Sequence, residues 1–187
     1  MNIFNVYPLF DIEIEKGEGS YVWDTNGTKY LDLYGGHAVI SIGHTHPHYV
    51  EKITNQLSKI GFYSNSIQIP QQKELASKLI QLSGKEGYQL FFCNSGAEAN
   101  ENALKLASFS NGKKKVISFS KGFHGRTSLA VAVTDNKNIV APVNETENAI
   151  ILPFNDEQAL EKVFQENEIS SVIIEGIQGI GGIYEPT

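Results

Sequence analysis

The chain of 187 residues carries 15 Lys and Arg against 21 Asp and Glu, a formal net charge of −6. This mildly acidic balance argues against a nucleic-acid-binding protein, which needs a basic face. A hydrophobic share of 41% is typical of a globular chain with a buried core. No apolar run has the roughly 18–20 residues that cross a bilayer, and the N-terminus lacks the basic and apolar stretches of a secretory signal. We therefore expect a cytoplasmic protein with neither a membrane nor a nucleic-acid partner.

Arginine and cysteine each occur once. Arg126 stands against 14 lysines, and a lone arginine is a candidate for two-bond recognition of a carboxylate or phosphate, which lysine performs poorly. The alternative is an ordinary solvated surface residue. Cys93 excludes an internal disulfide and a multi-cysteine zinc site. Because it ends an apolar run, we expect it to be a small buried hydrophobic residue.

The first 45 residues predict a small β-meander or a pair of hairpins. Apolar and polar residues alternate up to residues 21–23. The Asn26-Gly27 pair then predicts a turn before a strand over residues 29–33.

Two helices and then an alternation of strands and helices follow. The helical spacing of apolar residues predicts helices that begin at Pro47 and Pro70, since proline suits the first turn of a helix. Beyond residue 88 the predicted strands are 89–93, 115–119, 149–154 and 171–174, and the predicted helices are 97–108 and 156–165. Residues 129–133 are apolar and of undetermined type. This alternation predicts an α/β layer with a largely parallel sheet.

A parallel sheet needs neighbouring strands on both sides and helices on both faces. The chain stops at Thr187, soon after a predicted buried strand. We therefore expect the sequence to be the N-terminal part of a longer protein.

The segment from Asn94 to Asn100 lies between a predicted strand and a predicted helix. Gly96 permits a tight turn and the approach of an anion, and the first N–H groups of the helix, including that of Ala97, carry the positive end of its dipole. Ser95 adds a hydroxyl donor, so a phosphate would fit. The alternative is a helix cap in which Ser95 and Glu98 form a capping box.

A second motif, residues 122–127, follows the predicted strand 115–119. Two glycines bracket Phe123, His124 and the lone Arg126. Such a loop can present Phe123 as a flat platform for a planar ring, and Arg126 as a fork for a carboxylate. The alternative is a plain turn with a core phenylalanine and a solvated arginine.

A third motif, residues 175–182, lies at the carboxyl end of a strand, which is the edge where open α/β sheets bind ligands. Glu175 ends an apolar run, so its carboxylate needs a hydrogen-bond or ion-pair partner.

A fourth motif holds His44, His46 and His48 at alternate positions. They could chelate a metal if the segment were extended. Pro47 favours a helix instead, so we expect a structural turn and no metal site.

Taken together, these motifs resemble the class III (subgroup II) pyridoxal-phosphate-dependent aminotransferases, most closely the acetylornithine/succinylornithine branch. The matching stretches, in the family's order, are residues 30–39 with 43–47, 94–101, 123–127 and 175–179. The resemblance implies the aspartate-aminotransferase-like fold, fold type I of the pyridoxal-phosphate enzymes. It also implies that residues 1–60 belong to the small domain and residues 61–187 to the first part of the cofactor-binding large domain.

The resemblance also implies a role for each singled-out residue. Residues 95–97 would hold the cofactor phosphate, Phe123 would stack on the pyridine ring, and Glu175 would lie close to the cofactor. Arg126 would bind the α-carboxylate of the substrate. The Schiff-base lysine would lie beyond Thr187, so we expect no catalytic lysine and no transaminase activity in these 187 residues alone.

The implied reaction is amino-group transfer between N-acetylornithine or N-succinylornithine and 2-oxoglutarate, in arginine biosynthesis, by a homodimer of the full-length enzyme. Gly176 and Ile180 depart from the family's Glu-Pro-Ile-Gln-Gly-Glu motif, whose second glutamate pairs with a distal arginine. Ile180 cannot form that pair, so the substrate choice stays open. The alternatives are an ornithine or 4-aminobutyrate aminotransferase, or a non-catalytic α/β module that binds a phosphorylated ligand.

Overall fold

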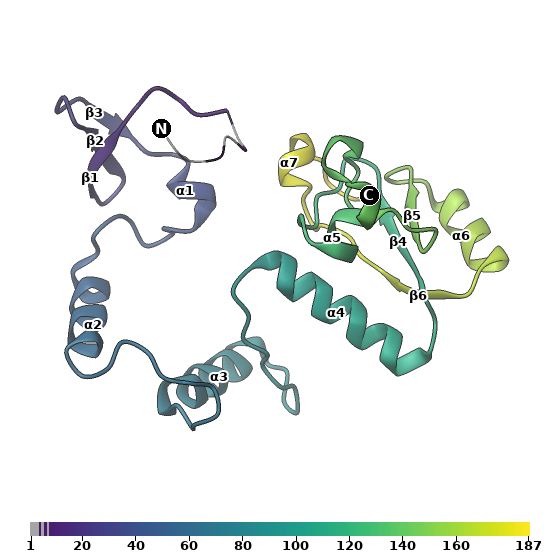
Figure 1. The fold of residues 1–187 in the computed structure, drawn as a ribbon, viewed down its shortest axis with the longest axis horizontal. Coiled ribbons are helices and arrows are strands. Elements are labelled where there is room, and N and C mark those ends of the chain that lie inside the picture. The colour runs from purple at the N-terminus through teal and green to yellow at the C-terminus, as the bar shows by residue number, and fades with distance from the viewer. Residues whose placement is uncertain (1–3, 5, 7) are drawn as a thin grey trace. The chain divides into compact units, whose positions relative to one another are not determined.

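The structure, a computed structural model, describes residues 4, 6 and 8–187. The chain divides into two compact units, Met1–Leu79 and Ile80–Thr187 (Figure 1). Residues 1–3, 5 and 7, which fall in the predicted β-rich segment, lie outside the described residues. The predicted limits 1–60 and 61–187 concern the domains of a longer enzyme and stay a prediction.

An antiparallel sheet opens the first unit. Its strands, in spatial order, are β1 (Ile14–Glu18), β2 (Tyr21–Asp24) and β3 (Lys29–Leu31), so the predicted meander is confirmed. The turn between β2 and β3 has Gly27 at φ 81°, a conformation that glycine adopts without steric cost. β3 ends at Leu31, earlier than predicted.

Three helices follow along the chain: α1 (Gly35–Ala38), α2 (Pro47–Leu57) and α3 (Pro70–Ser83). The two longer ones begin at the predicted prolines. All four residues of α1 have positive φ, so it is a left-handed turn. No helix among the described residues is both long and apolar enough to cross a bilayer.

The histidine motif forms a structural turn. His44 Nε2 lies 2.7 Å from Asp32 Oδ2, and the backbone of His44 pairs with that of Gly19. The bond from His44, followed by backbone N–H groups, holds the pKa of Asp32 below its usual value. His48 lies in the first turn of α2. The described residues contain no group of three His, Cys, Asp or Glu side chains that could hold a metal ion.

The second unit is built around a parallel sheet. Its elements are α4 (Gly96–Asn111), β4 (Lys115–Phe119), α5 (Ser128–Ala132), η1 (Lys137–Ile139), η2 (Pro142–Asn144), β5 (Ala149–Leu152), α6 (Glu157–Glu166), β6 (Ile169–Val172) and α7 (Gly179–Gly182). β4 lies in the middle and pairs in parallel with β5 on one side and β6 on the other. The predicted α/β layer is confirmed.

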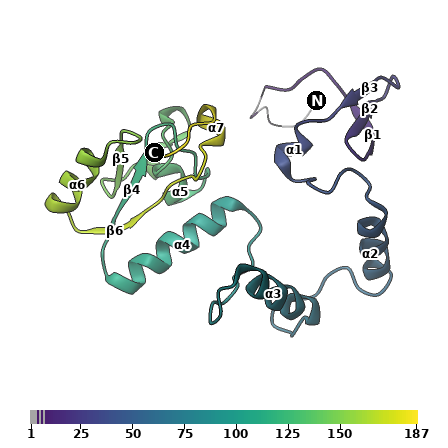
Figure 2. The ribbon, with the colours of Figure 1, turned by 180° about the vertical axis from the view of Figure 1, so that it is seen from behind.

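Helices cover both faces of this sheet, as Figures 1 and 2 show. On one face Ile117 and Phe119 pack with Leu160 and Val163 of α6. On the other face Val116 packs with Leu104 of α4 and with residues of α5 and its C-terminal end. This arrangement follows from the strand geometry, because successive side chains of β4 point to opposite faces.

Three sequence predictions in this unit differ from the structure. Residues 89–93 form no strand, because no described strand lies beside them to accept their backbone hydrogen bonds. Cys93, expected to be buried, is exposed for the same reason. The predicted strand 171–174 is displaced to Ile169–Val172, where the backbone pairs with β4.

Candidate functional site

The first part of the site is the N-terminus of α4. Ser95 is the N-cap, and its hydroxyl oxygen accepts a hydrogen bond from the N–H of Glu98 at 3.2 Å. The Glu98 carboxylate in turn accepts from the N–H of Asn94. The cap interpretation of this motif is therefore confirmed. The Glu98 carboxylate bonds the N–H of Asn94, one residue before the N-cap, and not that of Ser95 itself.

The cap leaves anion-binding capacity at the same helix end. The first N–H groups of a helix have no intrahelical acceptor, and the cap uses only that of Glu98. The N–H groups of Gly96 and Ala97 remain at the positive end of a 16-residue helix. A Cβ at Gly96 would meet no atom within 4 Å, so the space beside Gly96 is open.

The second part is the loop 120–127, which follows β4. Phe123 is half-buried and belongs to neither hydrophobic cluster among the described core residues. Arg126 is exposed. Of the two interpretations of Phe123, the structure thus disfavours a core residue.

Direct contacts join this loop to α4. The side-chain amide of Asn100 donates to the carbonyl oxygen of His124 at 2.7 Å. Gly125 is buried and has φ 135°, and a Cβ at this position would lie 2.7 Å from Ala97 Cβ. Glycine therefore allows the loop backbone to lie directly against the first turn of α4.

The Glu101 carboxylate extends the same junction. Its Oε1 accepts from the backbone N–H of Ala130 at 2.8 Å and from the Thr127 hydroxyl at 3.1 Å. It thereby supplies the N-terminal cap of α5, where Thr127 makes no side-chain cap bond. Ala97, Asn100, Glu101 and Leu104 have the spacing of one helix face, so a single face of α4 holds the loop and the core.

The third part, the segment after β6, meets the loop through Glu175. Its carboxylate accepts from the N–H of Phe123 at 2.8 Å and from the N–H of Gly179 at 3.3 Å. The expectation that Glu175 needs a partner is confirmed. Gln178, which is 1% exposed, donates to the carbonyl oxygen of Ser120 at 2.9 Å. All three predicted motifs therefore converge at the carboxyl edge of the sheet.

The residues that hold these parts together were not predicted from the sequence. Asn100 ends the first motif and Glu101 follows it, and their helical spacing from Ala97 could have indicated a shared face. Thr134 has no such signal. Its buried hydroxyl accepts from the N–H of His124 and donates to the carbonyl oxygen of Ala130, both at 2.9 Å.

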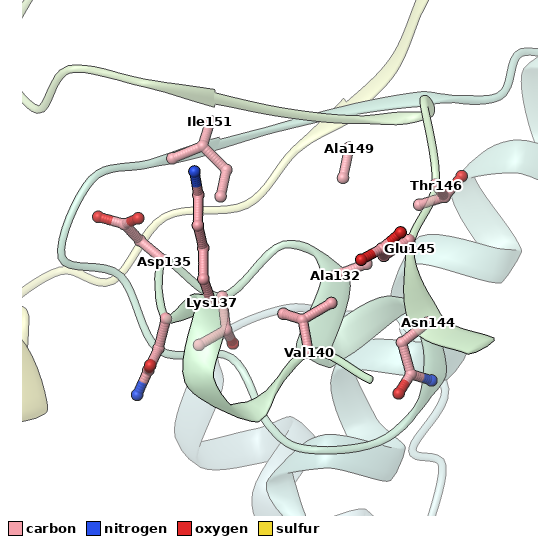
Figure 3. Close-up of a pocket in the computed structure, with 11 residues that line it drawn as sticks. Ala132, Asp135, Lys137, Val140, Asn144, Glu145, Thr146, Ala149 and Ile151 are labelled. Atoms are coloured by element: carbon pink, nitrogen blue, oxygen red, sulfur yellow. The ribbon is translucent and has the colours of Figure 1, made fainter. Parts of the chain in front are cut away.

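A pocket of about 380 Å³ lies elsewhere in this unit (Figure 3). Its walls come from the end of α5, the segment 134–146 and β5. Figure 3 shows Lys137 extending toward Ile151, with Glu145 and Thr146 at the other end. None of the predicted site residues lines this pocket, so it is separate from the candidate site.

His124 is the buried titratable residue of the loop, 6% exposed. Burial lowers the pKa of its imidazole below the ordinary 6.5, and the nearby Glu175 carboxylate offsets part of this effect. The folded state thus favours the neutral ring. Below about pH 6.5 the unfolded chain takes up a proton more readily than the folded chain, so the free energy of unfolding falls.

We expect His124→Gln to reduce this acid sensitivity. The difference in free energy of unfolding between the wild type and the variant should be largest near pH 8 and should narrow between about pH 6.5 and 5. Denaturant titrations of both proteins at four pH values measure this difference in free energy of unfolding. A difference that stays constant over this range would contradict a lowered pKa.

The chain matches the family model described as Aminotransferase class-III over residues 5–187. It is 44% identical over 184 residues to the acetylornithine aminotransferase of Archaeoglobus fulgidus, covering 98% of this chain and 48% of that protein. It is 40% identical over 183 residues to that of Bacillus amyloliquefaciens, covering 97% and 79%. The chain thus spans about half the length of most of the curated relatives it matches.

Solved structures agree with this result. The ornithine aminotransferase of Toxoplasma gondii ME49 superposes with a TM-score of 0.90 at 25% identity, over 100% of this chain and 46% of that one. The N-acetylornithine aminotransferase of Stenotrophomonas maltophilia K279a superposes with a TM-score of 0.79 at 30% identity, over 98% and 46%. The fold is therefore that of the pyridoxal-phosphate-dependent aminotransferases, and the chain belongs to the class-III aminotransferases.

Proposed function

We propose that the full-length protein is an N-acylornithine aminotransferase, which uses pyridoxal 5'-phosphate to move an amino group between N-acetylornithine or N-succinylornithine and 2-oxoglutarate. The observation that carries the proposal is the convergence of the α4 N-terminus, the Phe123–Arg126 loop and Glu175. The 44% identity to an acetylornithine aminotransferase supports the substrate class. A cytoplasmic homodimer working in arginine biosynthesis is part of the same proposal and rests on the family resemblance.

The residues present fit the proposed cofactor. The N–H groups of Gly96 and Ala97 lie in the first turn of a helix, at the positive end of its dipole, which suits a phosphate dianion. The Ser95 hydroxyl accepts from Glu98 and still has a proton to donate, because a hydroxyl does both. Phe123, outside both hydrophobic clusters, offers a flat face to a planar ring.

Each group of this chain then has one task. When bound, pyridoxal phosphate supplies the electron sink for amino-group transfer. The α4 N-terminus holds the phosphate, the Phe123 ring fixes the cofactor plane, and Arg126 binds the substrate α-carboxylate with two parallel hydrogen bonds. The proposal assigns covalent attachment of the cofactor to none of the 14 lysines of this chain.

Amino-transfer assays test the substrate class. The full-length protein, loaded with pyridoxal phosphate and 2-oxoglutarate, should form glutamate from N-acetylornithine or N-succinylornithine with a higher kcat/KM than from ornithine or 4-aminobutyrate. The TM-score of 0.90 to an ornithine aminotransferase makes ornithine the competing donor. A higher kcat/KM with ornithine would contradict the proposal and favour an ornithine aminotransferase. Absence of both cofactor binding and turnover would favour the non-catalytic module.

We expect Phe123→Ala to weaken cofactor binding without unfolding the protein. The ring packs with neither hydrophobic cluster, so its main contact would be the cofactor. The Kd of pyridoxal phosphate should rise roughly tenfold, given about 1.4 kcal/mol for a stacked aromatic pair beyond burial. The melting temperature of the cofactor-free protein should change little. A large drop there would identify Phe123 as a core residue.

A further inference from the structure

Glu175 makes two hydrogen bonds that join separate loops. Its Oε1 accepts from the N–H of Phe123 at 2.8 Å, across 52 positions of sequence, and its Oε2 accepts from the N–H of Gly179 at 3.3 Å. A half-buried carboxylate requires such donors. Both oxygens are thus directed to backbone groups of this chain.

The loop backbone leaves room for this carboxylate. A Cβ at Gly122 would lie 3.8 Å from Glu175 Oε1, 3.0 Å from His124 Nε2 and only 2.8 Å from the carbonyl oxygen of Phe119. A side chain at Gly122 would therefore crowd the point where Glu175 reaches the Phe123 N–H.

The other end of the same loop is held independently. Gln178 bonds the carbonyl oxygen of Ser120, and the backbone of Gly181 lies against that of Lys121, where a Cβ would come to 2.5 Å from its carbonyl oxygen. The Lys121 Nζ also lies 3.7 Å from the ring centroid of Tyr184. Loss of the Glu175 bonds should therefore free the Phe123 N–H, while Asn100 and Thr134 still hold His124 and the two loops stay together.

We propose that Glu175 is a positioning residue, whose carboxylate fixes the backbone of Phe123 and thereby the plane of the ring that stacks on the cofactor. It acts through Phe123 and makes no contact with the reacting atoms. This inference rests on the proposed function for the identity of the stacked ligand. The bond between Glu175 and the Phe123 N–H does not depend on it.

The test is Glu175→Gln in the full-length protein. The amide keeps one acceptor oxygen, but its NH₂ group faces an N–H donor, so one of the two bonds is lost. Hydrogen exchange of peptides that contain Phe123 should be about tenfold faster. The Kd of pyridoxal phosphate, read from the absorbance of the bound cofactor, should rise about tenfold. At saturating cofactor, kcat and the KM for the amino donor should return to the wild-type values.

Glu161→Gln is the matched control. It removes the same charge from an exposed position on α6, and it should change neither Kd nor exchange at Phe123. Glu175→Asp keeps the charge but shortens the reach, so it should behave like Glu175→Gln.

Three outcomes would overturn the proposal. A low kcat at saturating cofactor with unchanged Kd would make Glu175 a catalytic contact. Unchanged exchange at Phe123 would show that the bond does not hold the loop. Loss of the fold in both variants would mean that the core, and not the loop, requires the carboxylate. If the wild type binds no pyridoxal phosphate, the proposed function fails, whereas the exchange measurement still decides the role of Glu175.

Discussion

Arg126→Lys should lower kcat/KM for the amino donor by roughly 30- to 1,000-fold, which corresponds to about 2–4 kcal/mol of transition-state binding. Lysine keeps the positive charge but offers a point charge in place of the planar fork that matches a carboxylate. The loss should therefore reflect geometry and not net charge. The Kd of pyridoxal phosphate should stay within about twofold of the wild type, because Arg126 is assigned to the substrate.

The control exchanges the same two residue types elsewhere. Lys162→Arg lies on the exposed face of α6, where Lys162 pairs loosely with Glu166 at 3.9 Å, and it should leave kcat/KM unchanged. An Arg126→Lys enzyme with wild-type kcat/KM would refute the assignment to the α-carboxylate. A raised cofactor Kd with an unchanged donor KM would move Arg126 from the substrate to the cofactor.

The variants at Arg126, Phe123 and Glu175 separate binding of the substrate from binding of the cofactor. A substitution at Arg126 should change the kinetics with the donor, whereas the other two should change the Kd of pyridoxal phosphate. This division follows from the fold. One side of the loop lies on α4 through Asn100 and Gly125, while Glu175 holds it from the segment after β6.

The sequence predicts the sheet well where a strand carries its own signal. Lys115–Phe119 is predicted at the correct bounds because β4 is the central strand, buried on both faces, and carries the apolar residues Val116, Ile117 and Phe119. Residues 89–93 have a similar apolar run, yet they form no strand. The two segments differ because β4 has neighbouring strands to pair with and residues 89–93 have none among the described residues. A local sequence pattern does not show whether such a neighbour exists.

The residues of the candidate site were predicted one by one, whereas the contacts that connect them were not. Ser95, Phe123 and Glu175 each follow from local chemistry and from the rule that ligands bind at the carboxyl edge of a parallel sheet. The bond from Asn100 to the His124 carbonyl and the bonds of Thr134 depend on which backbone groups the fold brings together. A sequence read residue by residue contains no direct record of such contacts.

Gly125→Ala should be the most destabilising of the substitutions discussed. The new Cβ would lie 2.7 Å from Ala97 Cβ, 3.0 Å from Ala97 Cα and 3.1 Å from Ala130 Cβ. All three atoms are fixed by the backbones of α4 and α5, so no flexible side chain can yield. The φ of 135° adds strain for any residue with a Cβ. Overpacking and strain together predict a loss of roughly 2–6 kcal/mol.

Two matched glycines separate these two causes. Gly112, the C-cap of α4, has φ 70° but nothing within 4 Å of a Cβ, and Gly176 has neither a positive φ nor a neighbouring atom. Gly112→Ala should cost about 1–2 kcal/mol from strain alone, and Gly176→Ala should change stability by less than about 1 kcal/mol. Denaturant midpoints of the three full-length variants measure the series. If Gly125→Ala costs no more than Gly112→Ala, the loop can move away from Ala97, and the close contact between the loop and α4 is not what holds the site together.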